Sequence, residues 1–570
     1  MEDLVNGFKT VNSISMIEEM TLAGGESRKL EYTYTPSTAS IDSVSFVTDD
    51  KNIANVDEDG YVVGISVGRT KITLTILSNS KTVSASCLVN VTSEYESGKT
   101  SLNYTYDDYT DNNIYNIDSC PSIGNPKLLV IPVWFTDSKA YIRPDHKENV
   151  RQDIEKVYFG KEEDTGWNSV KTYYQYLSNN KLKLDGVVSN WYETTYSSKE
   201  VKTNETTMKI VSSAVKWYFS TDNKNASRKD FDTNGDGFLD GVMLIYGAPD
   251  YGTSKSSNSN LWAYCFWMQT LNPNKYAPNE NVFFWASYDF MYDNALSLVR
   301  TGYSFGGGDV SHQKLDSHTY IHEMGHVLGL DDYYDYSDDA YVAAGGFSMQ
   351  DMNVGSHDPY STLALGWSNP YIPVSSCTIE LKPFQSSNEL ILLSNKFNST
   401  KSPFNEYMLL EYYTPDGLNN LDSTYTYSKN YPNGSRKSGI RLWHVDARLA
   451  QYNSYTDSFS SNLISDPTKG NITHAMSNSY NSKDYGSVLG SKYYDYNILQ
   501  LIHKNNKSNY RPTEFFSDSS LFVVNDTYKQ SSYSKQFVKG SKMNNDSYLG
   551  WSFTILEMNN ESITISLVKE

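Results

Sequence analysis

Residues 322–332 read HEMGHVLGLDD, and this stretch predicts how the middle of the chain folds. His322 and His326 are four residues apart, so on an α-helix they lie on one face, one turn from each other. Two imidazoles in that arrangement can bind a single metal ion. Glu323 follows the first histidine, about 100° further round the helix, which leaves its carboxylate beside the metal ion rather than on it. The pattern therefore predicts a helix that carries two metal ligands and an adjacent carboxylate.

A third ligand is expected shortly after this helix. Gly329 can end the helix in the left-handed conformation, so that the chain turns back towards the ion. Asp332 lies six residues after His326, at the spacing of the H-E-x-x-H-x-x-G-x-x-H/D pattern, and is the favoured ligand. Two imidazoles, one carboxylate and an open position for water favour zinc. Glu411 is a distant alternative, because a carboxylate inside the apolar run YMLLEYY needs a cation or a salt-bridge partner. The other nearby candidates are Asp331 and Asp335.

The composition indicates several packed domains on an acidic chain. The chain has 570 residues, 38% of them hydrophobic, so about two to four domains are expected. A net charge of −19 repels phosphate backbones and anionic lipids, which argues against nucleic acid as a partner. No apolar stretch reaches the length of about 18 residues that predicts a membrane span. The start MEDLVNGFKT shows no signal peptide. We expect a secreted or bacterial cell-surface protein whose leader has been removed.

The four cysteines are far apart in the sequence, at positions 87, 120, 265 and 377. None of them forms a C-x-x-C pair. Their spacing therefore predicts neither a disulfide framework nor a zinc finger.

Residues 1–98 are expected to form an all-β sandwich. KITLTI at 71–76 and VSASCLVNV at 83–91 alternate apolar and polar residues, which buries one face of a strand. Residues 52–76, NIANVDEDGYVVGISVGRTKITLTI, resemble the bacterial Ig-like domains of group 2. The resemblance implies a spacer or adhesive module of secreted and surface proteins. The polar residues 99–126 are expected to be a linker.

Residues 127–370 mix strand and helix patterns, which predicts an α+β domain. KLLVIPVWF (127–135) and GVMLIYG (241–247) are typical of buried strands, and Pro132 indicates a bulge or an edge position in the first. Helical patterns occur in HKENVRQDIEKVYFG, SVKTYYQYLS and VKTNETTMKIVSSAVKWYFS. Strand patterns dominate residues 371–570, so a β-rich C-terminal region is expected.

Residues 127–370 also resemble the catalytic domain of the immune inhibitor A family of secreted bacterial metallopeptidases. The resemblance rests on KLLVIPVWFTD, SVKTYYQYLSNNKLKLDGVV, FDTNGDGFLDGVMLIYG, HEMGHVLGLDDYYDY and GGFSMQDMNVGSHDPYSTLALGW, and continues into EYMLLEYY and GIRLWHVD. It implies a zincin fold and zinc-dependent endopeptidase activity on extracellular proteins or peptides, host proteins among them. His322 and His326 become zinc ligands, and Glu323 becomes the general base that activates water. The C-terminal region could then complete the catalytic unit.

The mechanism implied by the resemblance needs further groups near the metal. A donor to the oxyanion is expected, and the sequence does not rank the candidates Tyr334, Tyr336, His357, Tyr360 and His444. Met349 and Met352 follow the helix, and one of them could form a methionine turn beneath the metal, as in metzincin peptidases. Both are equally consistent with core methionines.

The stretch FDTNGDGFLDGV (231–242) predicts a second metal site. Oxygen-bearing side chains alternate around a glycine in it, which resembles a calcium-binding loop. Position twelve of the loop is Met243 instead of glutamate, so a bidentate ligand would come from Asp240 or from elsewhere. The alternative is a plain acidic turn, since Asp, Asn and Gly favour turns. The predicted calcium ligands are Asp232, Asn234, Asp236, the carbonyl of Phe238, and Asp240.

The sequence also supports a function of another class. A surface adhesin or glycan-binding protein with a vestigial zincin domain would fit the Ig-like domain and the tyrosine-rich C-terminal region. Glu323 argues against this alternative, because a site that only binds has no use for a general base.

Overall fold

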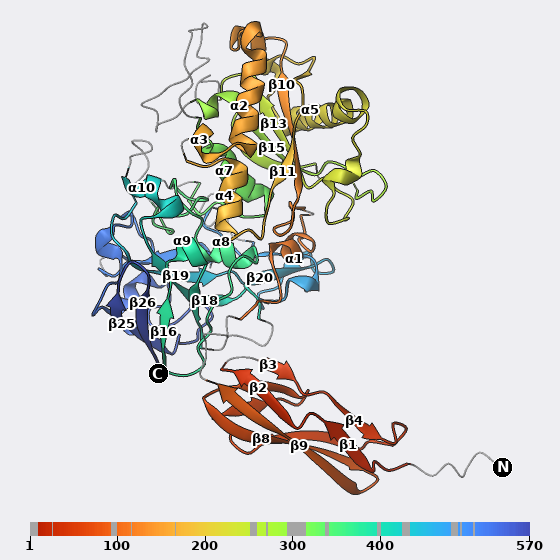
Figure 1. Cartoon of the computed structure of the whole chain (residues 1–570), viewed down its shortest axis with the longest axis vertical. Helices are drawn as coiled ribbons and strands as arrows, with labels where there is room; N and C mark the ends of the chain where they lie inside the picture. Colours follow the sequence, from red (N-terminus) through yellow and green to blue (C-terminus); the bar gives the residue numbers. More distant parts are fainter. Residues whose placement is uncertain are drawn as a thin grey trace, which may run out of the picture.

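The computed structural model shows three parts along the chain (Figure 1). An N-terminal β-domain lies at one end, a sheet covered by helices lies at the other, and the β-rich C-terminal region lies between them. The expected multidomain, β-rich organisation is confirmed. The structure describes residues 9–570 except 25–26, 93–99, 116, 166, 251–258, 269–271, 293–314, 337–340, 396–400, 425–433, 480–487, 491–492 and 506–507. The expected boundary at residues 98–99 falls outside the described residues.

The N-terminal domain is a β-sandwich. One sheet has the order β2-β9-β8-β5 and the other the order β3-β7-β6, beside the short pair β1-β4. Cys87, Val89 and Val91 in β9 are buried in the core, whereas Leu88 between them is exposed, as the alternation predicts. The strands are β1 (Ser13–Met16), β2 (Glu19–Ala23), β3 (Ser27–Lys29), β4 (Tyr32–Thr35), β5 (Ser43–Thr48), β6 (Ala54–Val56), β7 (Tyr61–Gly64), β8 (Gly68–Ser78) and β9 (Lys81–Thr92).

The described residues of the segment 99–126 differ from the expected linker, because several of them pack into the core of the following part. The segment contains the short helix α1 (Tyr106–Thr110), whose Tyr106 and Tyr109 rings are buried there. Cys120 is also buried, and its N–H donates to the carbonyl of Val327 at 2.8 Å. The polar composition suggested a solvated linker, but the tyrosine rings supply apolar area that outweighs it.

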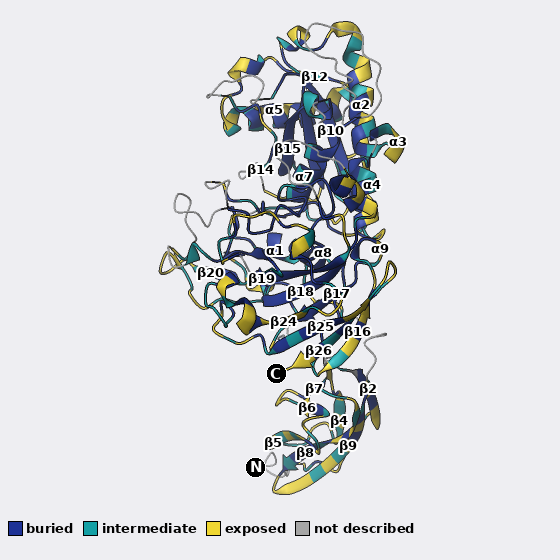
Figure 2. Cartoon of the chain, turned by 90° about the vertical axis from the view of Figure 1, so that its left-hand side faces the viewer, coloured by how far each residue is buried: buried dark blue, intermediate teal, exposed yellow. Residues whose placement is uncertain are grey.

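The central sheet has the strand order β11-β10-β13-β15-β14, and β12 pairs with β10. All of its pairs are parallel except β14 with β15. Its inner strands are buried on both faces, which explains their nearly continuous apolar sequences (Figure 2). The strands are β10 (Lys127–Trp134), β11 (Asp185–Val188), β12 (Tyr192–Glu193), β13 (Gly241–Tyr246), β14 (Tyr264–Trp267) and β15 (Val282–Ser287).

Helices cover both faces of this sheet. Buried residues of α5 share a cluster with one face of the sheet, and those of α2, α4 and α7 share a second cluster with the other face. The helices are α2 (Lys147–Phe159), α3 (Glu162–Thr165), α4 (Val170–Leu177), α5 (Asn204–Trp217), α7 (His318–Val327) and α8 (Pro359–Ala364). None of the helices in the described part of the chain has both the length and the apolar character needed to cross a membrane.

Pro132 lies inside the sheet and not on an edge strand, at an irregularity in the pairing of β10 that agrees with the expected bulge: three steps along β10, from Val130 to Val133, oppose four steps on the partner side. The carbonyl of Val133 accepts from Gly247 after β13, so the adjacent Pro132 directs its backbone to the opposite side. There the pairing with β11 ends at Val130 and the pairing with β12 begins at Val133. The missing N–H of the proline therefore falls between two short partner strands, where no ladder bond is lost.

The C-terminal region contains two packed antiparallel sheets, β17-β18-β19-β23 and β16-β26-β25-β24. The first is buried on both faces, against the second sheet and against the core that contains α7. The central and C-terminal parts thus share a continuous core. The remaining elements are α9 (Phe384–Ser387), α10 (Asn420–Thr424), β16 (Cys377–Leu381), β17 (Leu390–Leu393), β18 (Glu406–Tyr413), β19 (Gly439–Asp446), β20 (Leu449–Asn453), β21 (Ser458–Phe459), β22 (Ile472–His474), β23 (Leu499–Ile502), β24 (Thr527–Lys529), β25 (Trp551–Met558) and β26 (Ile563–Lys569).

Glu411 in β18 has a structural partner in the neighbouring strand. It lies opposite Arg441 of β19, and their charged groups are 3.6 Å apart with side chains only 3% exposed. The indole N–H of Trp443 also donates to Glu411 at 3.1 Å. The guanidinium of Arg441 stacks on the Tyr413 ring, 3.7 Å from its centroid. The cation that the apolar run requires is therefore arginine.

Replacing one member of this buried pair should destabilise the protein strongly. We expect Arg441→Met to lower the free energy of unfolding by about 3–5 kcal/mol, because it leaves the Glu411 carboxylate buried without its cation. Glu411→Gln/Arg441→Met should recover at least half of this loss, since the amide still accepts from Trp443. Urea denaturation followed by near-UV circular dichroism measures both. An Arg441→Met protein as stable as the wild type would contradict the assignment.

Candidate metal centre

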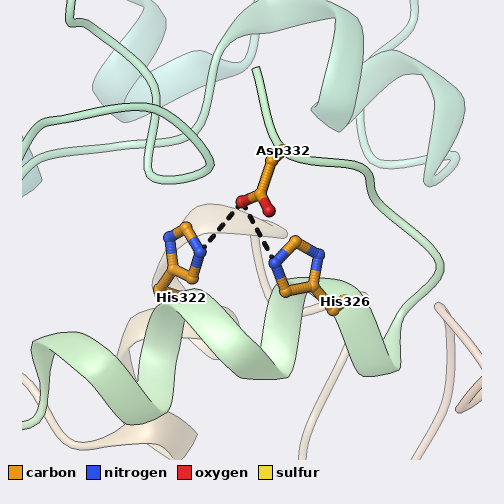
Figure 3. Close-up of side chains that lie close together, drawn as sticks. All are labelled: His322, His326 and Asp332. Carbon is orange, nitrogen blue, oxygen red and sulfur yellow. Dashed lines mark ion pairs between the residues drawn. The ribbon is translucent and has the colours of Figure 1, made fainter. Parts of the chain in front are cut away.

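The two histidines lie on one face of α7, as their spacing predicts (Figure 3). Asp332 comes from the chain that returns after the helix and points at both rings. Its Oδ1 is 3.1 Å from Nε2 of His322 and 3.2 Å from Nε2 of His326. Within the described residues, this is the one group of three His, Cys, Asp or Glu side chains whose ligand atoms all lie within 4.8 Å of one another. Asp331, Asp335 and Glu411 do not belong to it.

The return of the chain depends on Gly329. Its φ of 99° is in the left-handed region that favours glycine. The N–H of Gly329 donates to the carbonyl of His326, and the N–H of Leu330 donates to that of Gly325. These two bonds are the Schellman pattern that ends a helix and reverses the chain. Asp332 is thereby brought back over the helix face that carries the histidines.

Backbone carbonyls fix the orientation of both imidazoles. Nδ1 of His322 lies 2.7 Å from the carbonyl of Met349, and Nδ1 of His326 lies 2.7 Å from that of Leu330. A carbonyl only accepts, so each Nδ1 must carry the proton. A ring that carries only this proton has its lone pair on Nε2, the atom that faces Asp332. This is the arrangement in which histidines bind metal ions.

The charges of the cluster support the binding of a cation. Burial alone would raise the pKa of Asp332, but His326 and His322 lower it below its usual range. Burial would likewise lower the pKa of His326, whereas Asp332 and then Glu323 raise it to about 10. Oδ1 of Asp332 has no hydrogen-bond partner among the described residues. A proton can bridge Asp332 to only one imidazole at a time, whereas a divalent ion can bind both imidazoles and the carboxylate at once. The donor set therefore fits zinc.

Glu323 is buried next to this cluster. Its side chain is 6% exposed, and Oε2 has no hydrogen-bond partner within the described part of the chain. Burial raises the pKa of Glu323, against the opposing effect of His326 and His322. A carboxylate of raised pKa that does not bind the metal is suited to accept a proton from water.

Two buried residues that follow the helix in sequence, Met349 and Gln350, contact α7. A Cβ on Gly325 would come within 2.3 Å of Oε1 of Gln350, so any larger residue there would force this buried side chain to move. Nε2 of Gln350 is 3.3 Å from the ring nitrogens of His326. Met349 is fully buried and its carbonyl holds His322, whereas Met352 lines the adjoining cavity. Of the two methionines, Met349 therefore lies in the turn that supports the histidines.

The candidates for the oxyanion donor lie in different surroundings. Tyr334 stacks on His322, with ring centroids 6.5 Å apart, and lines the cavity. The hydroxyl of Tyr336 donates to Oδ2 of Asp332 at 2.6 Å. The remaining three are buried and bonded elsewhere: His357 to Tyr174, Tyr360 to Tyr106 and His444 to Glu406. Of the five, only Tyr334 and Tyr336 contact the cluster of His322, His326 and Asp332.

The acidic loop is closed by its own hydrogen bonds. Oδ2 of Asp232 accepts from the N–H of Gly237 at 3.2 Å, and Oδ1 of Asp236 accepts from Phe238 at 2.7 Å. The amide of Asn234 donates to Oδ2 of Asp236. Asp240 faces the start of β10, where it accepts from Lys127 and Thr233. The three aspartates do not form a ligand group like that of the histidines, and the calcium site stays a prediction.

Sequence reasoning missed the residues that come from distant segments. Gln350, Asp351, Tyr341 and Phe515 adjoin the cluster or its cavity, and the sequence predicted a role for none of them. The buried stretch SMQDM offered one signal, because polar side chains in a buried turn often serve a site.

Comparisons with known proteins identify the N-terminal domain. Residues 10–87 match the family described as bacterial Ig-like domain (group 2). No curated protein matches the chain. Similar solved structures include domains 4 and 5 of the S-layer protein SbsC (22% identity, TM-score 0.12, 15% of this chain and 53% of that one). A GH10 xylanase with a bacterial Ig-like domain from termite gut has 10% identity and a TM-score of 0.14, over 36% and 48% of the two chains.

A putative α-galactosidase/melibiase from Bacteroides fragilis is also similar, with 11% identity and a TM-score of 0.12, over 42% of this chain and 47% of that one. The chain thus spans about half the length of each of these three structures. TM-scores this low carry no argument about the other parts of the chain. The comparisons show that residues 10–87 are a bacterial Ig-like domain of group 2.

Proposed function

We propose that this protein is a secreted or cell-surface zinc endopeptidase of zincin type. The observation that carries the proposal is the convergence of two Nε2 atoms and Oδ1 of Asp332 on one point, next to the buried Glu323. The motif stretches that resemble the immune inhibitor A family support the same class of reaction. His322, His326 and Asp332 would hold the zinc ion.

A zinc ion bound there would supply a water of nearly neutral pKa and a Lewis acid for the scissile carbonyl. Glu323 would accept the proton of the attacking water and pass it to the leaving amine. Its buried position favours this role, because a raised pKa brings the carboxyl closer to the working pH. Tyr334 is the better oxyanion donor of the two neighbouring tyrosines, since the hydroxyl of Tyr336 already orients Asp332.

The proposed location and substrates follow from the N-terminal domain and the charge. Bacterial Ig-like domains of this group occur in extracellular or surface proteins. Proteins or peptides outside the cell, host proteins among them, would be the substrates, and a net charge of −19 disfavours nucleic acid.

A surface adhesin or glycan-binding protein with an inactive metal site is the second candidate, and the Ig-like domain favours it. The two candidates differ in what they require of Glu323. A site that only binds gains nothing from a buried carboxylate beside the ligands, which costs desolvation free energy. The enzyme is therefore the preferred function.

Purified protein should bind one zinc ion per chain through the three ligands. We expect His322→Ala and Asp332→Asn each to weaken zinc binding by at least about 10–100-fold, because the loss of a residue that only orients a metal ligand already costs this much. Asp331→Asn is the matched control, because this neighbouring carboxylate is not a ligand. Competition with a fluorescent chelator measures the affinities. Equal affinities in all four proteins would contradict the ligand set.

Glu323→Ala should remove hydrolysis without removing zinc. We expect its rate on casein to fall by about 10²–10⁴-fold, because proton transfer from water is lost. Zinc content, measured by mass spectrometry, should equal that of the wild type. The wild type should also lose activity with 1,10-phenanthroline. A zinc-loaded wild type that cleaves neither casein nor gelatin would favour the adhesin instead.

Calcium should stabilise the acidic loop if the second metal site exists. Binding to the folded state alone raises the stability by RT ln(1 + [L]/Kd), so millimolar calcium should raise the melting temperature. Asp232→Asn/Asp236→Asn should abolish the shift, and magnesium should give a smaller one. Scanning calorimetry checks this, and an unchanged melting temperature of the wild type counts against calcium.

A further inference from the structure

A cavity of about 670 Å³ adjoins the metal centre, and His322 is part of its wall. This volume lies within the range of protein sites that bind small molecules or side chains. The wall is completed from beyond the catalytic segment by Phe515 of the C-terminal region. A peptide held at the metal would therefore place a neighbouring side chain in this cavity.

Besides the proposed ligand His322, the ionisable groups that line the cavity are two aspartates, two tyrosines and His318. Asp335 and Asp351 are 3% and 6% exposed. Burial lowers the pKa of His318 to about 3, and its Nε2 lies 2.9 Å from the carbonyl of Asn353, so this ring is neutral. No lysine or arginine of the described residues lines the cavity. The cavity therefore attracts cations.

Asp351 is the carboxyl group that gains most from a cation. Its Oδ2 accepts from the N–H of Gly346 at 2.9 Å, whereas Oδ1 has no hydrogen-bond partner among the described residues. A buried carboxylate oxygen without a partner is unfavourable. Burial, with smaller contributions from Asp332 and Asp358, raises the pKa of Asp351 to about 7.

Arg511 interacts with Asp335, whereas no lysine or arginine of the described residues forms an ion pair with Asp351. Arg511 is electrostatically coupled to Asp335, although it also pairs with Asp495 at 3.0 Å. The guanidinium of Arg511 lies 4.5 Å from the centroid of the Tyr341 ring. Asp351 is therefore the main acidic determinant and Asp335 the secondary one.

The other walls suit a long side chain. Tyr334, Tyr341 and Phe515 present aromatic rings, and Met352 and Val342 are apolar. Such walls pack against the methylene groups of lysine or arginine, and ring faces attract the charged end. The chemistry of the cavity thus matches a cation at the end of an apolar stem.

We propose that this cavity is a specificity pocket for a lysine or arginine of the substrate next to the scissile bond, with Asp351 as the charge partner. The proposal rests on the proposed peptidase function and adds the substrate class.

Paired fluorogenic peptides test it directly. Each pair differs only by lysine against norleucine, which keeps the stem and removes the charge, at one of the positions flanking the scissile bond. At one position we expect kcat/KM of the wild type to favour lysine at least about tenfold. Asp351→Asn should lower this ratio by about tenfold, and Asp335→Asn should lower it less. Glu514→Gln, an exposed carboxylate beside Phe515 that does not line the cavity, is the matched control and should keep the ratio.

Binding gives a second readout that does not depend on turnover. Calorimetry with zinc-loaded Glu323→Ala should show the lysine peptide binding at least about tenfold more tightly than the norleucine peptide, and Asp351→Asn in this background should remove the difference.

Hydrolysis without preference for lysine, or a ratio that Asp351→Asn leaves unchanged, overturns the pocket and leaves the peptidase standing. If Asp351→Asn does not fold, the wild-type ratio decides, and a value near one overturns the proposal. A zinc-loaded wild type that hydrolyses no peptide overturns both.

Discussion

Two imidazole nitrogens and one carboxylate oxygen converge above α7: Nε2 of His322, Nε2 of His326 and Oδ1 of Asp332. The surrounding structure holds these three atoms together. Oδ1 of Asp332 lies 3.1 Å from Nε2 of His322 and 3.2 Å from Nε2 of His326. Such an arrangement is unfavourable unless a cation occupies it. The Met349 and Leu330 carbonyls orient the rings, and the Gly329 turn returns Asp332. The Leu330 carbonyl and the Gly329 turn are local in the sequence, whereas Met349 lies 27 residues from His322.

The cluster of His322, His326 and Asp332 is supported by two parts of the chain that are distant from it in sequence. The sheet β17-β18-β19-β23 packs on the same core as α7, and the helix α1 packs from the other side of the Gly329 turn. A Cβ on Gly329 would contact the side chains of Thr110 and Tyr106 at 3.2 and 3.3 Å. The catalytic unit that we propose therefore begins before residue 127 and extends beyond residue 370. The Ig-like domain has a separate core.

The sequence predicted the features that depend on local spacing. The helix with His322 and His326 and the alternating strands of residues 71–91 follow from periods of 3.6 and 2 residues, and the left-handed Gly329 follows from the preference for glycine at a helix end. The structure has all three. Features that depend on register or tertiary packing were not predictable. The partner of Glu411 is fixed by the pairing of β18 with β19, and the place of Pro132 by the gap between β11 and β12. The cavity joins Asp351 to Phe515 from another region, and no pattern connects them.

The central claim is that one zinc ion is held by two imidazoles and one carboxylate. X-ray absorption at the zinc edge of the zinc-loaded protein tests it most directly. The account predicts a first shell of nitrogen and oxygen only, with two imidazole nitrogens at about 2.0–2.1 Å and oxygens at about 2.0–2.2 Å. A shell that contains sulfur, or one without imidazole, would contradict it.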